Sequence, residues 1–185
     1  MMTDNIKKGL ADETPKTKIS HTKNVKLMSP EFVQSRLEFL HKERQASPND
    51  VNGMMDPQYV AADYYEGTAT LKFVAKEWEM NRVGIMHGGV TSSILDHSAG
   101  CAVYNFLGHW CPTLDMDIRY LSQVCLGDEL TCVGRVIHAG ERFVTAEAVL
   151  TNDTNGRLVA MGTMTYANGA KRAEGAIGDG VRHEG

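Results

Sequence analysis

One long helical pattern, residues 88–106, is followed as far as residue 166 by strand patterns alone. Its apolar residues recur on one side of a helix, at a spacing near 3.6 residues. Antiparallel strands that follow each other closely form a sheet that needs a cover on one face. We therefore expect an α+β domain in which the sheet wraps around this single long helix. The four predicted strands are 113–120, 130–139, 142–151 and 157–166, and turn signals at 139–141 and 152–156 separate the last three.

Three further elements are predicted before the long helix. Ser29 is a suitable N-cap and Pro30 suits a first turn, which predicts a helix over residues 29–46. Strands are predicted at 59–65 and 69–74, with a Glu-Gly turn between them that favours a hairpin. The segment between the first helix and these strands is rich in Asn, Gly and Pro and is expected to be a loop.

The two ends of the chain differ in composition from its centre. Residues 1–28 are polar and lysine-rich without periodicity, and we expect a flexible arm. Residues 168–185 are rich in glycine and charge and are expected to form a disordered tail. This leaves one domain over residues 29–167. The formal net charge of −4 argues against a general nucleic-acid binder, which would present a basic face.

The four cysteines, Cys101, Cys111, Cys125 and Cys132, lack the C-x-x-C spacing of zinc sites. We expect reduced thiols, no metal and no cofactor. No apolar run approaches the roughly 20 residues that span a bilayer, and the N-terminus has no secretory pattern. A cytoplasmic location is therefore expected.

The sequence His87-Gly88-Gly89 lies where the long helix begins. Free N–H groups at a helix start, together with the positive end of the helix dipole, favour an anion or an oxyanion. The pair of glycines allows another group to approach the backbone closely. Hydrolysis of a thioester needs a donor of this kind, because the carbonyl oxygen gains negative charge in the transition state.

Asp96 lies further along the same helix. The side of the helix that carries Asp96 also carries small residues, among them Gly89 and Ser92, so that a ligand has room beside the carboxylate. A carboxylate can serve as a nucleophile or as a general base on water. Considered alone, each residue has an ordinary explanation: Asp96 as a structural acid, the glycine pair as a tight loop, and His87 as a structural hydrogen-bonding residue.

Taken together, Asn81, Gly84, His87, Gly88, Gly89 and Asp96 at their spacing, followed by T-L-D-M-D-I-R-Y-L-S and L-V-A-M-G-T-M-T-Y, resemble a known family. The family is that of the hotdog-fold acyl-CoA thioesterases, in the PaaI-like and thioesterase superfamily member 2 branch. The resemblance covers residues 59–167. It implies a hotdog fold, an acyl-CoA substrate, and hydrolysis to a free acid and CoA.

The resemblance also implies a role for each matching residue. Asp96 would be the nucleophile or the base, Asn81 would orient the water or the substrate, and the Gly88 N–H would polarise the thioester carbonyl. His87 would support the loop or the carbonyl, and Thr113 would help to hold the attacking water. In this family the active site lies between subunits, so Asp96 would act with residues of a neighbouring chain in a homodimer or homotetramer.

The geometry of a helix points the same way. Gly88 and Asp96 are eight residues apart, about 12 Å along the axis at 1.5 Å per residue, which is too far to serve one carbonyl from one chain.

The contacts of the CoA part are less defined by the sequence. Gly89 and Ser92 are expected to bind substrate, and Arg119, Arg142 and Lys171 are candidates for its phosphates. The turn Gly140-Glu141-Arg142 departs from the family pattern, because an acid stands where many relatives carry a basic or polar residue. A non-catalytic acyl-CoA-binding protein remains the alternative function, and a dehydratase on the same fold is a third.

Overall fold

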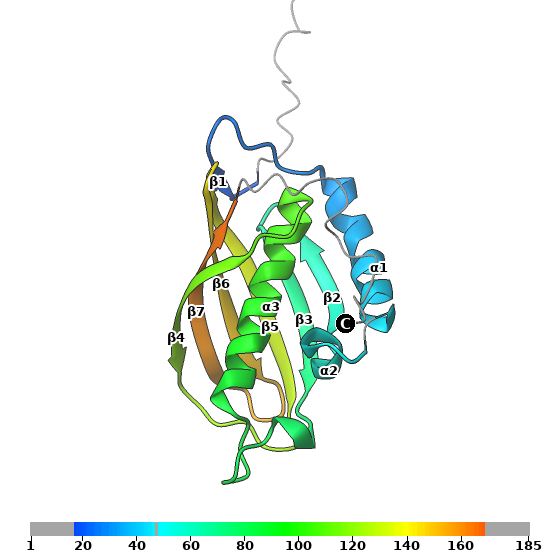
Figure 1. Cartoon of the computed structure of the whole chain (residues 1–185), viewed down its shortest axis with the longest axis vertical. Helices are drawn as coiled ribbons and strands as arrows, with labels where there is room; N and C mark the ends of the chain where they lie inside the picture. The colour runs from blue at the N-terminus through cyan, green and yellow to red at the C-terminus, as the bar shows by residue number, and fades with distance from the viewer. Residues whose placement is uncertain (1–16, 47, 169–185) are drawn as a thin grey trace, which may run out of the picture.

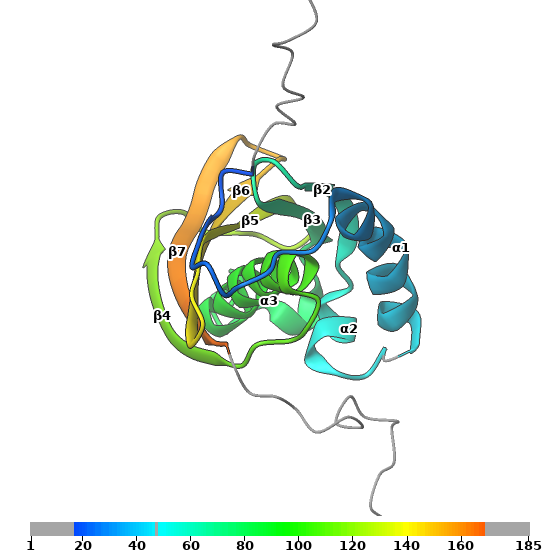
Figure 2. The same ribbon diagram turned by 90° about the horizontal axis from the view of Figure 1, so that it is seen from above.

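In the computed structural model, which describes residues 17–46 and 48–168, one sheet curves around the long helix α3 (Gly88–Leu107). Figures 1 and 2 show α3 running along the concave side of the sheet, with a second helix, α1 (Pro30–Ala46), beside it. The predicted α+β architecture and hotdog fold are confirmed.

The other elements surround α3. The strands follow the order β2-β3-β5-β6-β7-β4, and each pair of neighbours is antiparallel, so β2 and β4 form the two edges. The six predicted strands are confirmed, with ends shifted by no more than two residues. The six strands are β2 (Gln58–Asp63), β3 (Thr68–Val74), β4 (Thr113–Tyr120), β5 (Glu129–Ala139), β6 (Phe143–Asn152) and β7 (Arg157–Ala167). Two short helices lie between them and α1 or α3: α2 (Val51–Met55) and the 3-10 helix η1 (Glu77–Glu79).

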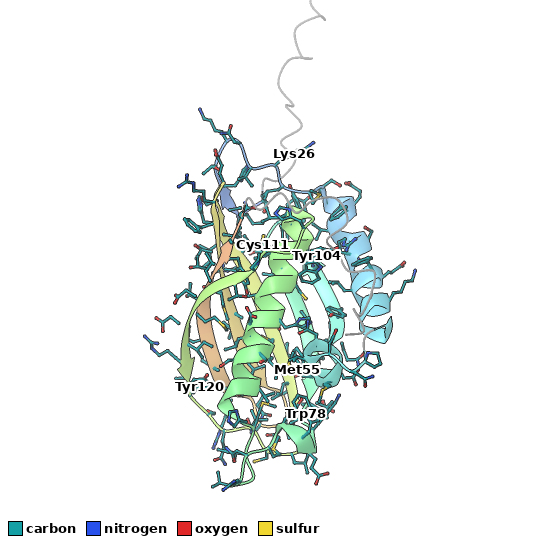
Figure 3. All side chains as sticks on the ribbon, viewed as in Figure 1. Lys26, Met55, Trp78, Tyr104, Cys111 and Tyr120 are labelled. Carbon is teal, nitrogen blue, oxygen red and sulfur yellow. The ribbon has the colours of Figure 1, made fainter. Side chains whose placement is uncertain are left out.

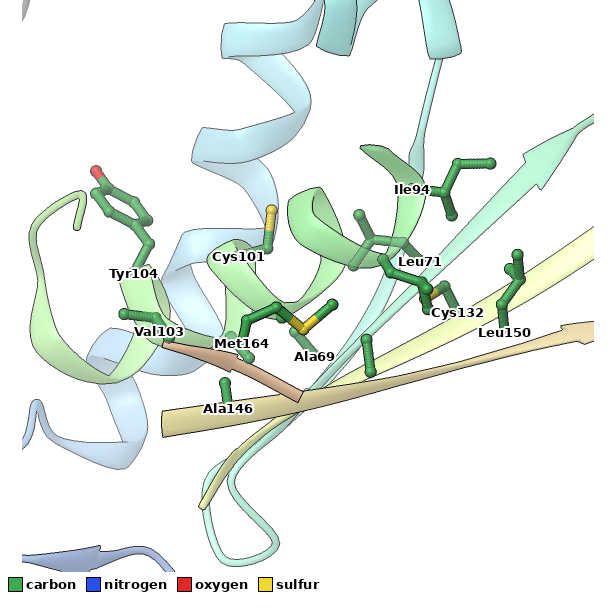
Figure 4. Close-up of a cluster of buried hydrophobic side chains, with 14 of the residues drawn as sticks. Ala69, Leu71, Ile94, Cys101, Val103, Tyr104, Cys132, Ala146, Leu150 and Met164 are labelled. Atoms are coloured by element: carbon green, nitrogen blue, oxygen red, sulfur yellow. The ribbon is translucent and has the colours of Figure 1, made fainter. Parts of the chain in front are cut away.

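The core lies between α3 and the concave face of the sheet (Figure 4). On the sheet it includes Leu71, Cys132, Leu150 and Met164, all of them buried. A Cβ atom at Gly134 of β5 would lie 2.2 Å from the Ser98 carbonyl oxygen, so only glycine lets α3 approach the sheet this closely. This close packing fixes the position of α3, and with it the position of every site residue that α3 carries.

The helices before β2 pack against α3 and the sheet edge. Ser29 caps α1 as predicted, because its hydroxyl accepts a hydrogen bond from the Phe32 N–H at 3.2 Å. The short helix α2 was expected to be a loop. It forms because Asp50 accepts a hydrogen bond from the Gly53 N–H at 2.6 Å and because Met55 is buried. Five residues are too few for apolar periodicity to reveal a helix.

The prediction of a flexible arm over residues 1–28 is wrong for residues 17–28. Ser20–His21 form strand β1, which pairs in parallel with the end of β5, and the neighbouring Ile19 is buried. Pairing of β3 with β5 stops at Thr68 opposite Arg135, which leaves the last residues of β5 free to take β1. Residues 1–16 and 169–185 lie outside the described residues.

Candidate active site

The start of α3 is closed by the His87 side chain. His87 is the N-cap residue, and its Nδ1 accepts a hydrogen bond from the Gly89 N–H at 2.9 Å. An imidazole that accepts at Nδ1 carries its proton on Nε2 in the neutral form. For the Gly88 N–H, no acceptor is found among residues 17–46 and 48–168. The exposed first turn of α3 therefore presents one free backbone donor, as an oxyanion site requires.

The loop before α3 is held by the Asn81 side chain. Its Oδ1 accepts hydrogen bonds from the N–H groups of Val83 at 3.0 Å and Ile85 at 3.3 Å. This oxygen therefore shapes the turn that leads to His87. The Nδ2 group of Asn81 is therefore the part of the side chain that can donate to water or substrate.

The same loop is anchored to the 3-10 helix η1. The His87 N–H donates to the Glu79 carbonyl at 2.7 Å, and the buried Glu79 carboxylate accepts from the Lys76 N–H at 2.9 Å. Burial raises the pKa of Glu79, and the hydrogen bond from Lys76 opposes that rise. These contacts attach the start of α3 to η1, which positions the Gly88 N–H.

Tyr120, at the end of β4, lies against the first turn of α3, and Figure 3 labels it there. Its hydroxyl is 2.5 Å from Ser92 Oγ and 3.3 Å from the Gly88 carbonyl oxygen. Ser92 also donates to that carbonyl at 3.0 Å. No role was predicted for Tyr120. Ser92, predicted to bind substrate, lies at the helix start with Gly88.

The Asp96 carboxylate receives two side-chain donors on the same oxygen. Thr113 Oγ1 donates to Oδ1 at 2.8 Å, and the Tyr166 hydroxyl lies 3.1 Å from both Oδ1 and the Asp96 carbonyl oxygen. Burial and the Asp96 charge raise the pKa of Tyr166, so Tyr166 stays protonated and can donate. No described residue donates to Oδ2, which leaves that oxygen for water or a substrate carbon.

Tyr166 was missed from the sequence. It is nearly fully buried at the end of β7, and a buried tyrosine normally needs a hydrogen-bond partner for its hydroxyl. An inward-facing tyrosine near the end of a predicted strand was therefore the signal that could have found it.

A cavity of about 230 Å³ adjoins Asp96. His97 forms part of its wall and is buried, with Nε2 3.1 Å from the Tyr59 hydroxyl. Burial lowers the pKa of His97 to about 4, so the imidazole is neutral at physiological pH. The Nε2 atom also lies 3.7 Å from Cys101 Sγ, so both contacts of this nitrogen are with residues other than Asp96. The cavity is lined by Val51, Asn52, Ser93, Asp96, His97, Gly100, Trp110, Cys111, Thr113 and Tyr166.

The structure divides the predicted site residues into two groups. Asp96 and Thr113 are brought together at the cavity, whereas Asn81, His87, Gly88, Gly89 and Ser92 gather at the start of α3. None of the second group lines the cavity. Gly88 and Asp96 are about 12 Å apart along α3 at 1.5 Å per residue. Within one chain, the free donor and the carboxylate therefore belong to different places.

The candidate phosphate contacts differ in their availability. Arg119 forms an exposed ion pair with Asp117 on its own strand, so its guanidinium is already engaged. Arg142 is exposed, and no partner for its side chain is found in the described part of the chain. Lys171 lies outside the described residues.

No group of three or more His, Cys, Asp or Glu side chains within residues 17–46 and 48–168 is arranged to hold a metal ion. In the same part of the chain, no helix has the length and apolar character needed to cross a membrane.

Comparison with known proteins agrees with the fold. Residues 83–159 match the family model of the thioesterase superfamily. Acyl-coenzyme A thioesterase 13 of Mus musculus is 31% identical over 91 residues, covering 49% of this chain and 65% of the mouse protein. The structure of zebrafish thioesterase superfamily member 2 superposes with a TM-score of 0.65 at 24% identity, over 72% of this chain and 98% of that one. A Streptococcus mutans protein bound to acetyl CoA superposes with a TM-score of 0.58 at 26% identity, over 64% and 92%.

The aligned part of the chain spans 65% of the mouse relative's length, just under two thirds. The family model covers the start of α3, Asp96 and the following strands as far as the first residues of β7. The fold is that of the hotdog proteins, and over residues 83–159 the sequence is similar to the thioesterase superfamily.

Proposed function

We propose that this protein hydrolyses acyl-CoA thioesters to a free acid and CoA. The observation that carries the proposal is the Asp96 carboxylate, which two side chains hold at one oxygen and which borders a cavity with its other oxygen unbonded by the described residues. The substrate class is supported by similarity to acyl-coenzyme A thioesterase 13 and to a protein bound to acetyl CoA.

Each bond change in the reaction has a group to assist it. As a base, Asp96 takes a proton from water, and the hydroxide forms a bond to the thioester carbonyl carbon. The carbonyl oxygen becomes an oxyanion, which the Gly88 N–H and the positive end of α3 stabilise. The C–S bond then breaks, and the CoA sulfur leaves with a proton from Asp96. As a nucleophile, Asp96 would instead form an anhydride that water hydrolyses.

The proposed site needs two chains. The free Gly88 N–H and the Asp96 carboxylate are about 12 Å apart along one helix, but a two-fold axis can bring one chain's donor to the other chain's carboxylate. The edge strand β4 supports this arrangement, because Leu114 and Tyr120 on it are each more than half exposed. An open strand edge with exposed apolar side chains is a surface that a second copy can cover.

The activity test is release of free thiol from acyl-CoA esters of varied acyl group. We expect turnover without added metal, and loss of turnover in Asp96→Asn. Tight binding of the esters in calorimetry, with no thiol released, would instead establish the non-catalytic binding protein. Absence of both binding and hydrolysis across the panel would refute the acyl-CoA assignment altogether.

Mixing two inactive variants tests the two-chain site. Asp96→Asn removes the carboxylate, and Gly88→Pro removes only the N–H at the first helical position, where proline is tolerated. If sites combine residues of two chains, randomly paired dimers of the two variants regain about a quarter of wild-type activity, because half of the dimers have one intact site of two. If the site lies within one chain, no activity returns on mixing.

Location and nucleotide contacts belong to the same proposal. The four cysteines are unpaired, which supports the reducing conditions of a cytoplasmic protein. Arg142, exposed and without a side-chain partner among the described residues, is the first candidate for the CoA phosphates. Arg119 is second, because a phosphate must displace Asp117 from it.

A further inference from the structure

One wall of the Asp96 cavity is formed by Trp110, in the connection between α3 and β4. The indole is partly buried, and its position is set by a neighbour rather than by the loop alone. Its ring stacks on Tyr104 of α3, with centroids 4.1 Å apart and planes inclined by 15°. Tyr104 is itself buried, so the stacked pair fixes one side of the indole while the cavity lies beside it.

The stack continues into α1. The Arg36 guanidinium lies 3.6 Å from the centre of the Phe39 ring and 4.5 Å from the centre of the Tyr104 ring, and it donates a hydrogen bond to the Tyr104 hydroxyl. Figure 3 labels Tyr104 on the side of α3 that faces α1. A cation between two aromatic rings is attracted by both ring faces. Arg36 thus connects α1 to Tyr104, and Tyr104 connects α3 to Trp110.

The short helix α2 contributes the neighbouring part of the wall. Val51 and Asn52 line the same cavity, and Lys76 holds the end of α2 by donating to the Met54 carbonyl at 2.9 Å. The helices before the sheet therefore act on the cavity twice, directly through α2 and indirectly through α1.

The size of the cavity limits what it can hold. Its volume of about 230 Å³ is below the roughly 300 Å³ at which pockets for whole small molecules begin. The nucleotide part of CoA must lie outside it, so the cavity is suited to an acyl group. A wall made of a large, stacked indole resists displacement by a longer chain, because the indole cannot turn away without breaking the stack with Tyr104.

From this geometry we infer that Trp110 closes the acyl end of the site, and that Arg36 positions it through Tyr104. The inference rests on the proposed function and specifies its substrate: acyl groups that are short or contain a single ring, in preference to chains of eight or more carbons. Trp110 is a specificity-determining residue, and Arg36 is a positioning residue.

The first test is selectivity along a series of acyl-CoA esters from acetyl to dodecanoyl. We expect kcat/KM of the wild type to fall steeply beyond short chains. In Trp110→Ala the ratio of dodecanoyl to butyryl kcat/KM should rise at least about tenfold. About tenfold is the lower end of the discrimination that an apolar pocket achieves for a single methylene group. Trp110→Leu, which keeps an apolar side chain at the position, should shift the ratio in the same direction and provides the test if the alanine variant does not fold.

The matched control is Trp78→Ala. Trp78 is the only other tryptophan of the chain, is 44% exposed and does not line the cavity. Its removal should leave the ratio within twofold of wild type. An unchanged ratio in both Trp110 variants, an equal shift in Trp78→Ala, or a wild type that prefers long chains would each overturn the inference.

Arg36 is tested by Arg36→Met and Arg36→Lys. The methionine variant keeps an unbranched side chain but loses the cation, and we expect its chain-length profile to broaden towards that of Trp110→Ala while kcat for acetyl-CoA changes little. The lysine variant restores a cation and should return the profile part of the way to wild type. A uniform loss of kcat for every chain length, without broadening, would show a merely structural role for Arg36.

A binding measurement separates this inference from the proposed hydrolysis. In Trp78→Phe combined with Asp96→Asn, Trp110 is the only tryptophan. Its fluorescence should change on addition of butyryl-CoA and not on addition of CoA. A wild-type protein that binds acyl-CoA but never releases thiol would refute hydrolysis and leave this signal intact. Wild-type hydrolysis with no butyryl-CoA-dependent signal in this variant would refute the role of Trp110 and leave the proposed function standing.

Discussion

The start of α3 provides a hydrogen-bond donor, whereas its middle provides a carboxylate, and the two are held in place by different means. At the start, side chains form hydrogen bonds to the backbone: Asn81 shapes the loop and His87 caps the helix. Among the described residues, the Gly88 N–H is left without an acceptor. In the middle, the side chains of Thr113 and Tyr166 donate hydrogen bonds to the Asp96 carboxylate.

The difference has a physical basis. A backbone donor can be oriented only by fixing the turn that carries it, so its supporting residues must lie close in sequence. The Asp96 carboxylate lies on a helix that the sheet surrounds, so its donors come from β4 and β7, and a partly buried charge without such donors is costly. The helix start is therefore held by residues that are close in sequence, and Asp96 is held by residues that only the tertiary structure brings close. Neither is a complete site, which is why the proposal joins them across two chains.

The largest effect is expected where the carboxylate is removed. Asp96→Asn keeps the size of the side chain but can neither attack nor accept a proton, so kcat should fall by about 10³-fold or more. Thiol release measures turnover, and circular dichroism checks the fold. Asp153→Asn, which alters an exposed carboxylate in the turn between β6 and β7, is the control and should retain wild-type turnover. Normal turnover in Asp96→Asn would exclude Asp96 as the reacting group.

Removal of the backbone donor should have the next largest effect. In Gly88→Pro the preceding residue, His87, already has φ −64° and ψ 134°, which the residue before a proline adopts readily. The helix should persist, while loss of one oxyanion donor lowers kcat by about 10²-fold to 10³-fold.

Gly88→Ala is the matched control for this donor. It keeps the N–H, and its Cβ would meet only Tyr120 at 3.7 Å, an ordinary contact. Its turnover should therefore stay within a few-fold of wild type. An equal loss in the alanine and proline variants would mean that the close approach to the backbone matters, and that the N–H does not.

A smaller effect is expected from the support of Asp96. Thr113→Ala removes the 2.8 Å hydrogen bond to Oδ1 and leaves that of Tyr166, so kcat/KM should fall by about tenfold, the value of one hydrogen bond to a charged group. Thr113→Ser keeps the hydroxyl and should recover most of the activity. If serine and alanine variants are equally impaired, the methyl group rather than the hydrogen bond is what Thr113 contributes.

The buried histidine in the middle of α3, His97, should make the stability of the protein depend on pH. Burial lowers the pKa of His97 to about 4, against about 6.5 for an exposed histidine. Between these values the unfolded chain binds a proton that the folded chain does not, so stability falls as the pH is lowered from about 6.5 to 4. Two to three pKa units correspond to about 3 kcal/mol.

Denaturant unfolding at several pH values measures this loss, with His97→Gln as the comparison. The glutamine variant cannot titrate at this position, and its stability should vary less over the same range. Parallel curves for the two proteins would assign the acid sensitivity to other groups.

The local part of the site was predictable from the sequence, and the tertiary part was not. His87, Gly88 and Gly89 stand together in the chain, and the rules for helix starts apply to them directly. Thr113 was assigned through family resemblance, whereas Tyr166, 70 residues from Asp96, was missed because no local pattern connects the two. The arm was misjudged for a similar reason: Ile19 and β1 are ordered by the free end of β5, far away in sequence.

The sequence by itself determined the order of the elements, the α+β architecture and the residues at the start of α3, because periodicity and turn chemistry act over a few residues. The hotdog fold followed from the family resemblance. Only the tertiary structure decided how Asp96 is held, and that α1 reaches the cavity through Arg36, Tyr104 and Trp110. These contacts depend on which distant side chains the wrapped sheet brings together. The spacing of residues along a chain does not encode that proximity.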